Sequence, residues 1–234
     1  MVDVQRKIRG SNRQIEIVRE IIREKLRASV ITLRNSIPNT KKTEDAICQV
    51  KKWIIQLEDP KLAKSIPQIL GIEGPAARAY FQAWEGIPLN WTGLSRKPIP
   101  RDWQKIGPRM MSWRKRARAA RHPINAMLNY GYALLKAQVR SELSAAGFDP
   151  SLGLMHGNSS SSLPLVYDFM EPLRPVIDAR ILQFAFANTF TPDDFTINRI
   201  GACRLHPQLA RKVVQHCGIG TERENGALSR LLTY

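Results

Sequence analysis

The chain has 234 residues, with 36 Lys or Arg against 20 Asp or Glu, so its formal net charge is +16 at pH 7. A hydrophobic fraction of 43% is enough for a buried core and excludes full disorder, while the positive charge favours polyanionic partners, nucleic acid before an anionic membrane surface. No apolar run approaches the ~18 residues of a spanning helix, the start MVDVQRKIRG shows no secretory signal, and three cysteines are too few for a disulfide framework. We therefore expect one domain over residues 1–234 in a reducing compartment, the cytoplasm.

Helical periodicity dominates the first part of the chain. Amphipathic or helix-favouring patterns predict helices over residues 13–34, 43–57, 61–70 and 71–84. Thr43 is predicted to be the N-cap of the second helix, which ends at Asp59-Pro60. Pro75 suits the first turn of the fourth helix, because its missing N–H costs nothing there.

Proline and glycine then interrupt the pattern, and residues 86–122 are predicted to form a basic, irregular insertion. Further helices are expected from Pro123 to a C-terminal glycine at Gly147, from Pro164 with kinks at later prolines, over 176–188 and over 206–217. The tail over 218–234 is expected to be loosely ordered. Because no segment alternates with a period of two, the predicted fold class is all-α, a multi-helix lobe with little or no β-structure.

The insertion contains the densest positive charge. Residues 96–121 carry ten Lys or Arg and a single acid, Asp102, which gives a local net charge of +9. Arg side chains can pair with phosphates and tryptophan faces such as those of Trp103 and Trp113 can stack on bases, so this stretch predicts nucleic-acid contact. The alternative is a solvated loop whose aromatic residues pack beneath it. The predicted DNA-binding residues are Arg96, Lys97, Arg101, Lys105, Arg109, Arg114, Lys115, Arg116, Arg118 and Arg121.

Acidic and histidine residues elsewhere indicate a metal site, because phosphodiester chemistry usually needs a divalent cation. Asp168 and Glu171 lie three residues apart in the apolar segment LPLVYDFMEPLRPVID, a spacing that places both on one face of a helix. Buried acids need a counter-charge, which could be a metal or Arg174, three residues after Glu171. Glu73 is either a ligand or an acid placed favourably at the positive end of a helix.

Four segments in order, IEGPAARAYF, HPINAMLNYGYALL, AAGFDPSLGLMHG and LVYDFMEPLRPVID, resemble the CRISPR-associated adaptation integrase, a metal-dependent endonuclease–integrase that inserts new spacers into CRISPR arrays. The earlier segment IIREKLRASVITLRN resembles the first helix of its catalytic lobe, so the similarity covers about residues 21–209. The resemblance implies an α-helical catalytic lobe with one site for Mg²⁺ or Mn²⁺. Asn125 and Tyr132 match the helix that packs behind this site.

Residue by residue, the resemblance implies that Glu73, His156 and Glu171 bind the metal. Glu171 stands where many relatives have Asp. Asp168 matches the first carboxylate of the motif and would orient a ligand or a metal-bound water. All four residues are implied to be catalytic.

The implied reaction is attack of a DNA 3′-hydroxyl on a phosphodiester, and water as the nucleophile would give nicking instead. The implied partners are double-stranded DNA, as incoming segment and as repeat array, further copies of the chain, and a small partner protein of the adaptation complex. The family usually carries an N-terminal β-rich domain that makes the dimer contact and helps bind this partner. Because the sequence begins almost directly in the helical lobe, dimer geometry and the partner stay open.

Two other functions remain compatible with the residues. One is a stand-alone or transposon-related metal-dependent DNA nuclease that uses the same site. The other is a non-catalytic DNA-binding subunit, in which the acidic residues form only salt bridges.

Overall fold

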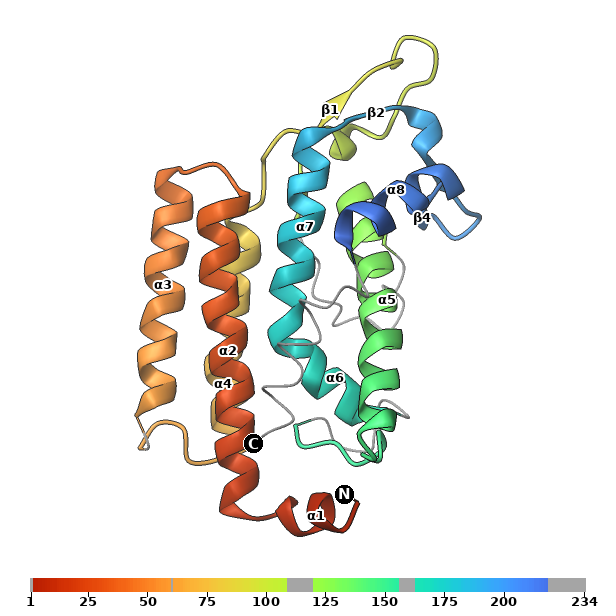
Figure 1. Ribbon diagram of the computed structural model, residues 1–234. Coiled ribbons are helices and arrows are strands. Elements are labelled where there is room, and N and C mark those ends of the chain that lie inside the picture. The colour runs from red at the N-terminus through yellow and green to blue at the C-terminus, as the bar shows by residue number, and fades with distance from the viewer. Residues whose placement is uncertain (1, 60, 109–119, 156–162, 219–234) are drawn as a thin grey trace.

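A computed structural model of the chain describes residues 2–59, 61–108, 120–155 and 163–218, and these are mostly helical, as the sequence predicts. No helix in these ranges is long and apolar enough to cross a membrane. Figure 1 shows the helices α1 (Val2–Ile8), α2 (Asn12–Ser36), α3 (Lys41–Glu58), α4 (Ile66–Gln82), α5 (Pro123–Ala145), α6 (Pro164–Met170), α7 (Arg174–Ala187) and α8 (Pro207–Cys217).

Within the described ranges, four short strands accompany the helices. Strand β1 (Asn90–Trp91) pairs in parallel with β2 (Thr189–Phe190), and β3 (Phe195–Ile197) pairs antiparallel with β4 (Cys203–Leu205). Strands of two or three residues are too short to show an alternating pattern, which is why the sequence did not predict them.

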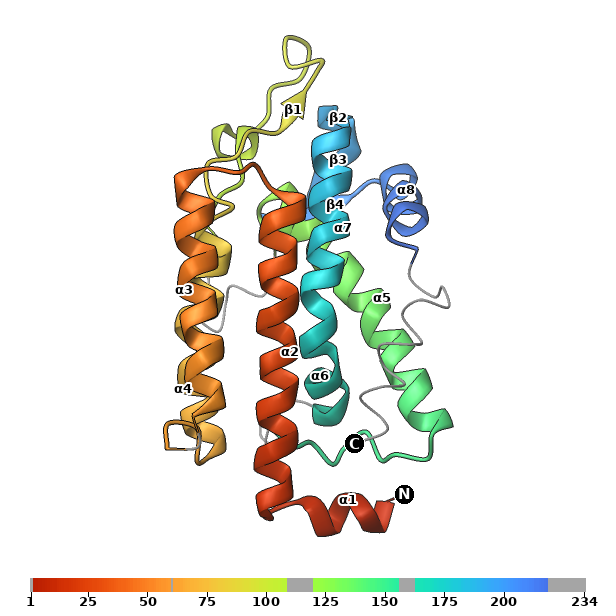
Figure 2. The same ribbon diagram turned by 60° about the vertical axis from the view of Figure 1, so that its left-hand side comes forward.

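Helix α2 lies between two groups of helices. It packs against α3 and α4 on one side and against α7 on the other, as Figures 1 and 2 both show. Its predicted apolar residues Ile21, Leu26 and Val30 are buried. The following helix begins earlier than predicted, since Thr40 is its N-cap and the N–H of Thr43 donates to Thr40 Oγ1 at 3.2 Å.

Helix α4 runs through the point where two helices were predicted. Ser65 caps its start, and Pro75 lies in its interior rather than in a first turn. Pro75 cannot donate a backbone hydrogen bond, but the packing of α4 against α2 and α3 keeps the helix continuous. Glu73 is therefore an interior helix residue, and the reading of it as an acid at a positive helix end is wrong.

The prolines between α6 and α7 change the direction of the chain, as predicted. A 3₁₀ turn, Glu171–Leu173, contains Pro172 and separates the two helices, and Pro175 lies in the first turn of α7. This turn packs against α2, so residues at its start face the N-terminal helices.

Helices α5 and α7 approach closely at Gly131. A Cβ atom at this position would lie 2.7 Å from Ile177 Cγ2, so only glycine allows the observed distance between the helices. The neighbouring residues Tyr132 and Asp178 are thereby brought into hydrogen-bonding contact. The close contact is thus one determinant of the site described below.

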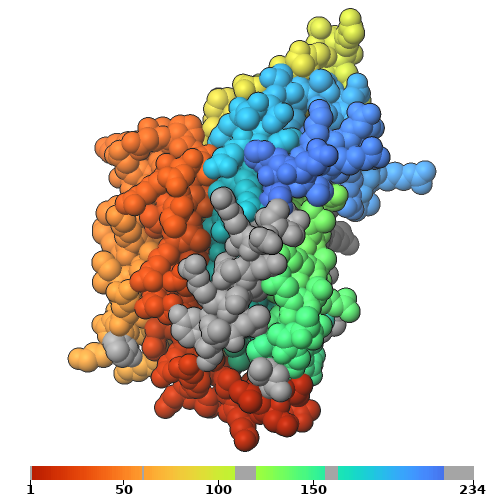
Figure 3. All heavy atoms as spheres, viewed as in Figure 1, coloured from red at the N-terminus to blue at the C-terminus, as the bar shows by residue number. Residues whose placement is uncertain are grey.

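The buried apolar residues form two clusters. Among the described residues, one lies mainly within α2, α3 and α4, and the larger one joins α5 to α8 and the irregular segment that contains Trp103 to buried residues of α2, α3 and α4 such as Leu33, Ala46 and Tyr80. Figure 3 shows α2 and α3 on one side of the molecular surface and α5 on the other. Ile47 and Leu154 contact both clusters, and the polar pocket described next lies between the two.

Candidate metal centre

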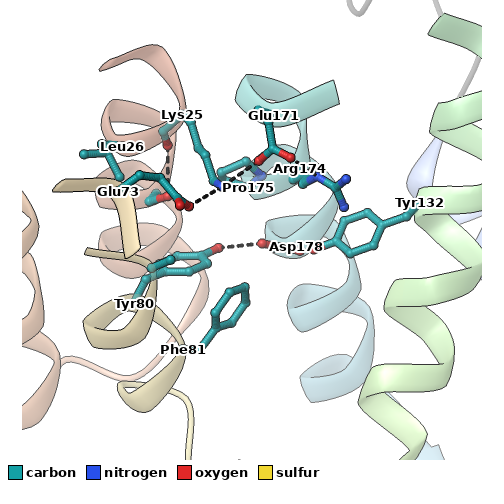
Figure 4. Close-up of a pocket in the computed structure, with 12 residues that line it drawn as sticks. Lys25, Leu26, Glu73, Tyr80, Phe81, Tyr132, Glu171, Arg174, Pro175 and Asp178 are labelled. Atoms are coloured by element: carbon teal, nitrogen blue, oxygen red, sulfur yellow. Dashed lines mark hydrogen bonds and ion pairs between the residues drawn. The ribbon is translucent and has the colours of Figure 1, made fainter. Parts of the chain in front are cut away.

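Two of the three predicted metal ligands meet between α4 and the turn that precedes α7. Glu73 Oε1 and Glu171 Oε2 each lie 2.6 Å from the ammonium nitrogen of Lys25, which extends from α2 (Figure 4). The other oxygen of Glu171, Oε1, accepts a hydrogen bond from Arg174 Nε at 3.0 Å. Carboxylates that are far apart in the sequence therefore share one cation, and the predicted Glu171–Arg174 salt bridge is also present.

The Lys25 ammonium that the two carboxylates share is partly shielded from solvent. The side chains of Lys25, Glu73 and Glu171 are 16%, 19% and 11% exposed. Burial lowers the pKa of Lys25, but attraction to Glu171 and Glu73 outweighs that effect and holds the pKa above its ordinary value. Lys25 is consequently charged at neutral pH.

These residues suit a divalent cation. Carboxylate oxygens are the ligands that Mg²⁺ and Mn²⁺ prefer, and here two of them already surround a positive charge. Among residues 2–59, 61–108, 120–155 and 163–218, no third His, Cys, Asp or Glu completes a metal-binding cluster. His156, the third predicted ligand, lies outside these ranges.

Asp168 has different partners from Glu171. Its carboxylate is fully buried, and Oδ2 accepts the backbone N–H groups of Leu154 at 2.5 Å and of Met155 at 3.1 Å. The two acids do not extend from one regular helical face, because α6 ends at Met170, between them. Asp168 instead holds the segment that immediately precedes residue 156.

Asp178, which sequence reasoning missed, forms a second polar group beside the acidic pair. It is buried and accepts hydrogen bonds from the hydroxyls of Tyr80, at 3.0 Å, and of Tyr132. The guanidinium of Arg174 lies 5.0 Å from the centre of the Tyr132 ring. Burial and the charge of Asp178 raise the pKa of Tyr80 well above its ordinary value, so this phenol remains a hydrogen-bond donor.

A pocket of about 220 Å³ joins these groups. Tyr132, predicted to lie behind the site, is part of the pocket wall, whereas Asn125 is a partly buried residue in the first turn of α5. The lining residues come from four helices and the turn: Lys25, Leu26, Ser29, Glu73, Ala77, Tyr80, Phe81, Tyr132, Glu171, Arg174, Pro175 and Asp178.

Sequence reasoning also missed Lys25, although a signal was present. Lys25 is four residues after the buried Ile21 and four before the buried Ser29, so it lies on the inward face of α2. A lysine on such a face needs an acidic partner. The sequence could therefore have indicated a buried ion pair, but not which acids form it.

The described Lys and Arg residues of the basic stretch are exposed. Lys97 Nζ pairs with Asp193 at 2.7 Å. Five of the predicted DNA-binding residues, Arg109, Arg114, Lys115, Arg116 and Arg118, lie outside the described residues. The other five have exposed side chains: Arg96, Lys97, Arg101, Lys105 and Arg121.

The described tryptophans of residues 86–122 pack inward. Trp103 is 3% exposed and stacks on Trp91 with 6.0 Å between ring centres, and its Nε1–H donates to the carbonyl of Arg121 at 2.9 Å. The alternative of aromatic residues packed beneath the loop is therefore correct for these two residues, and the expected base stacking is wrong for Trp103. Trp113 lies outside the described residues.

The exposed basic residues and the acidic pair belong to opposite ends of α7. Glu171 lies three residues before the start of this helix, and β2, which pairs with β1 of the basic segment, follows its end (Figure 1). With 14 residues, α7 is about 20 Å long. The described basic surface thus begins about one helix length from the acidic pair.

Residues 4–218 match the family model described as CRISPR associated protein Cas1. A CRISPR-associated endonuclease Cas1 from Thermus thermophilus is 29% identical over 205 residues, covering 86% of this chain and 55% of the relative. A casposase bound to its integration product has a TM-score of 0.70 at 26% identity and covers 92% of this chain and 57% of its own. A chain of a partial Cas6-RT-Cas1–Cas2 complex has a TM-score of 0.72 at 21% identity, covering 92% and 60%. The chain therefore spans about half the length of these relatives.

Proposed function

The chain belongs to the Cas1 family of CRISPR-associated endonucleases and integrases, and from this premise we propose that it is a divalent-metal-dependent DNA strand transferase. Its substrates are short DNA segments, which it inserts into a CRISPR array. The observation that carries the proposal is the pair of carboxylates, Glu73 and Glu171, held around one positive charge in a pocket between the two groups of helices. The similarity to a casposase bound to its integration product supports the same chemistry.

Glu73 and Glu171 would hold the metal, with His156 as the third ligand that the resemblance implies. When bound, Mg²⁺ or Mn²⁺ supplies Lewis-acid polarisation of the phosphodiester and stabilises charge on the leaving oxygen. Arg174 fixes the orientation of Glu171 through its Nε–H and adds positive charge to the pocket. Asp168 positions the backbone that leads to His156.

The transfer exchanges one phosphodiester for another. The 3′-oxygen of the incoming strand bonds to phosphorus and loses its proton, while the bond to the displaced 3′-oxygen breaks and that oxygen gains a proton. Tyr80 and Tyr132, both fixed by Asp178, form the wall of the pocket beside the acidic pair. Water in place of the 3′-hydroxyl gives nicking.

Residues 1–234 act as one catalytic unit in this proposal, with 86–122 as its DNA-binding insertion. At 3.4 Å per base pair, a surface about 20 Å away contacts the duplex about six base pairs from the reacting phosphate. All ten Lys and Arg of residues 96–121 would follow the DNA backbone. The assembly contains double-stranded DNA and further copies of the chain, and the similarity to a Cas1–Cas2 complex supports a small partner protein.

The test incubates the purified chain with a short duplex and a repeat-containing plasmid in the presence of Mn²⁺. We expect Glu171→Gln and His156→Ala to abolish joining and to leave DNA binding nearly intact. Glu44→Ala, an exposed acid on α3, is the matched control and should join DNA normally.

Each alternative has its own outcome in this assay. Normal joining by Glu171→Gln or in the presence of a chelator overturns the site assignment. Metal-dependent nicking without joined products identifies a nuclease. DNA binding with neither reaction identifies a non-catalytic subunit in which the acidic residues only form salt bridges.

A further inference from the structure

We propose that Lys25 is an exchangeable counter-ion of the metal site: its ammonium lies between Glu73 and Glu171 when no metal is bound and must leave when a metal enters. This inference rests on the proposed function and adds a residue that competes with the metal. The observation behind it is that one nitrogen atom contacts one oxygen of each carboxylate at 2.6 Å.

The ammonium and a metal cannot be held by the same two oxygens at once. Mg²⁺ binds carboxylate oxygens at about 2.0–2.1 Å, so an ion ligated by Glu73 Oε1 and Glu171 Oε2 would overlap the present position of Lys25 Nζ. Binding the metal through these atoms therefore requires the ammonium to move. The four-carbon stem of lysine allows this movement by rotation of the side chain, without a shift of α2.

Glu171 is held in place while the exchange occurs. Lys25 contacts its Oε2 atom, whereas Arg174 donates to its Oε1 atom from the first residue of α7. The loss of Lys25 thus leaves one oxygen of Glu171 anchored and releases the other as a ligand. Arg174 thus fixes the carboxylate, and the ammonium of Lys25 lies where the metal would bind.

The counter-ion also explains how the protein tolerates two acids here before a metal binds. Carboxylates this close and this little exposed repel each other, and the repulsion is strong where water is scarce. The ammonium offsets it until a divalent ion takes over that role. We therefore expect removal of Lys25 to destabilise the metal-free protein and to strengthen metal binding.

The exchange changes the charge that the pocket presents to DNA. Its lining contains two positive side chains and three negative ones, which sum to −1. A divalent ion changes the sum to +1, provided that the displaced ammonium of Lys25 stays near the pocket. A net positive pocket attracts an anionic phosphodiester and a net negative one repels it, so metal binding should precede engagement of the reacting phosphate.

The experiment measures Mn²⁺ affinity by isothermal titration calorimetry, without DNA. We expect Lys25→Met to bind Mn²⁺ about tenfold more tightly than the wild type, because it removes both the competitor and its charge. Arg27→Met is the matched control on the same helix, since Arg27 is 47% exposed and pairs with Glu24 at the surface. Its affinity should change less than about twofold.

Two further variants complete the test. Lys25→Arg keeps a cation and should retain weak, wild-type-like binding, whereas Lys25→Gln lacks the charge and replaces Lys25→Met if that variant does not fold. The inference is overturned if the neutral variants bind Mn²⁺ no more tightly than the wild type, or if Lys25→Arg binds as tightly as they do. Failure of the wild type itself to bind Mn²⁺ would instead overturn the proposed function.

Discussion

Replacing Asp168 by Asn should loosen the backbone at Leu154 and Met155 without creating a cavity. The side chain is fully buried, and its Oδ2 atom accepts two backbone N–H groups. A hydrogen bond to a charged acceptor contributes about 1.5–3 kcal/mol and one to a neutral acceptor about 0.5–1.5 kcal/mol. Asn keeps an acceptor oxygen but loses the charge, so the two bonds together should weaken by about 2–3 kcal/mol.

Asp168→Ala should cost more than Asp168→Asn. It leaves the N–H groups of Leu154 and Met155 without this acceptor, at about 1–3 kcal/mol each, or about 2–6 kcal/mol in total. Urea denaturation followed by tryptophan fluorescence measures both free energies of unfolding. Asp45→Asn, an exposed change on α3, is the control and should alter stability by less than about 0.5 kcal/mol.

The same variants separate stability from metal binding. Because Met155 immediately precedes His156, Asp168→Asn should weaken Mn²⁺ binding in calorimetry while DNA affinity changes little. The reasoning is refuted if Asp168→Asn is as stable as the wild type, or if Asp168→Ala is no less stable than Asp168→Asn. A lower free energy of unfolding with unchanged Mn²⁺ affinity would refute only the role of Asp168 in positioning the metal ligand.

Three further predictions concern other parts of the chain. Burial lowers the pKa of His122 against the opposing effect of its carbonyl partners. As the pH falls below about 6.5, the unfolded chain therefore takes up a proton that the native chain does not. The stability that neutral His122 contributes is fully present above pH 6.5 and is lost as the pH falls to the lower native pKa. Urea midpoints from pH 5 to 7.5 should show this loss, and His122→Asn, which retains an N-cap, should flatten it. Gly131→Ala should destabilise the protein by up to about 2 kcal/mol, because overpacking costs about 1–3 kcal/mol and alanine recovers about 1 kcal/mol in a helix. This cost should vanish in an Ile177→Ala background, and additive effects in a double-mutant cycle would contradict the close helix contact. Affinity for duplex DNA, measured by fluorescence anisotropy, should fall about a thousandfold between 50 and 200 mM salt, and a loss of less than tenfold would contradict extensive phosphate contact.

Local patterns in the sequence were sufficient to locate most helices. The apolar face of residues 13–34 corresponds to α2, and Pro123 and Gly147 mark the start of α5 and the residue just beyond its end. These predictions succeeded because periodicity and capping depend on residues within a few positions of each other. The prediction of a helix start at Pro75 is wrong for the same reason, since the helix there is maintained by packing against α2 and α3, which a local pattern does not show.

For the site, too, the sequence determined some features and the tertiary structure determined others. The resemblance named Glu73 and Glu171 as ligands, and the sequence alone determined that Asp168 and Glu171 lie in an apolar segment and need a counter-charge. Only the tertiary structure decided that this partner is Lys25 as well as Arg174, and that Asp178 joins two tyrosines beside them. Contacts between residues this far apart in the chain depend on how closely the helices pack, and that spacing is set by tertiary contacts such as the one between Gly131 and Ile177.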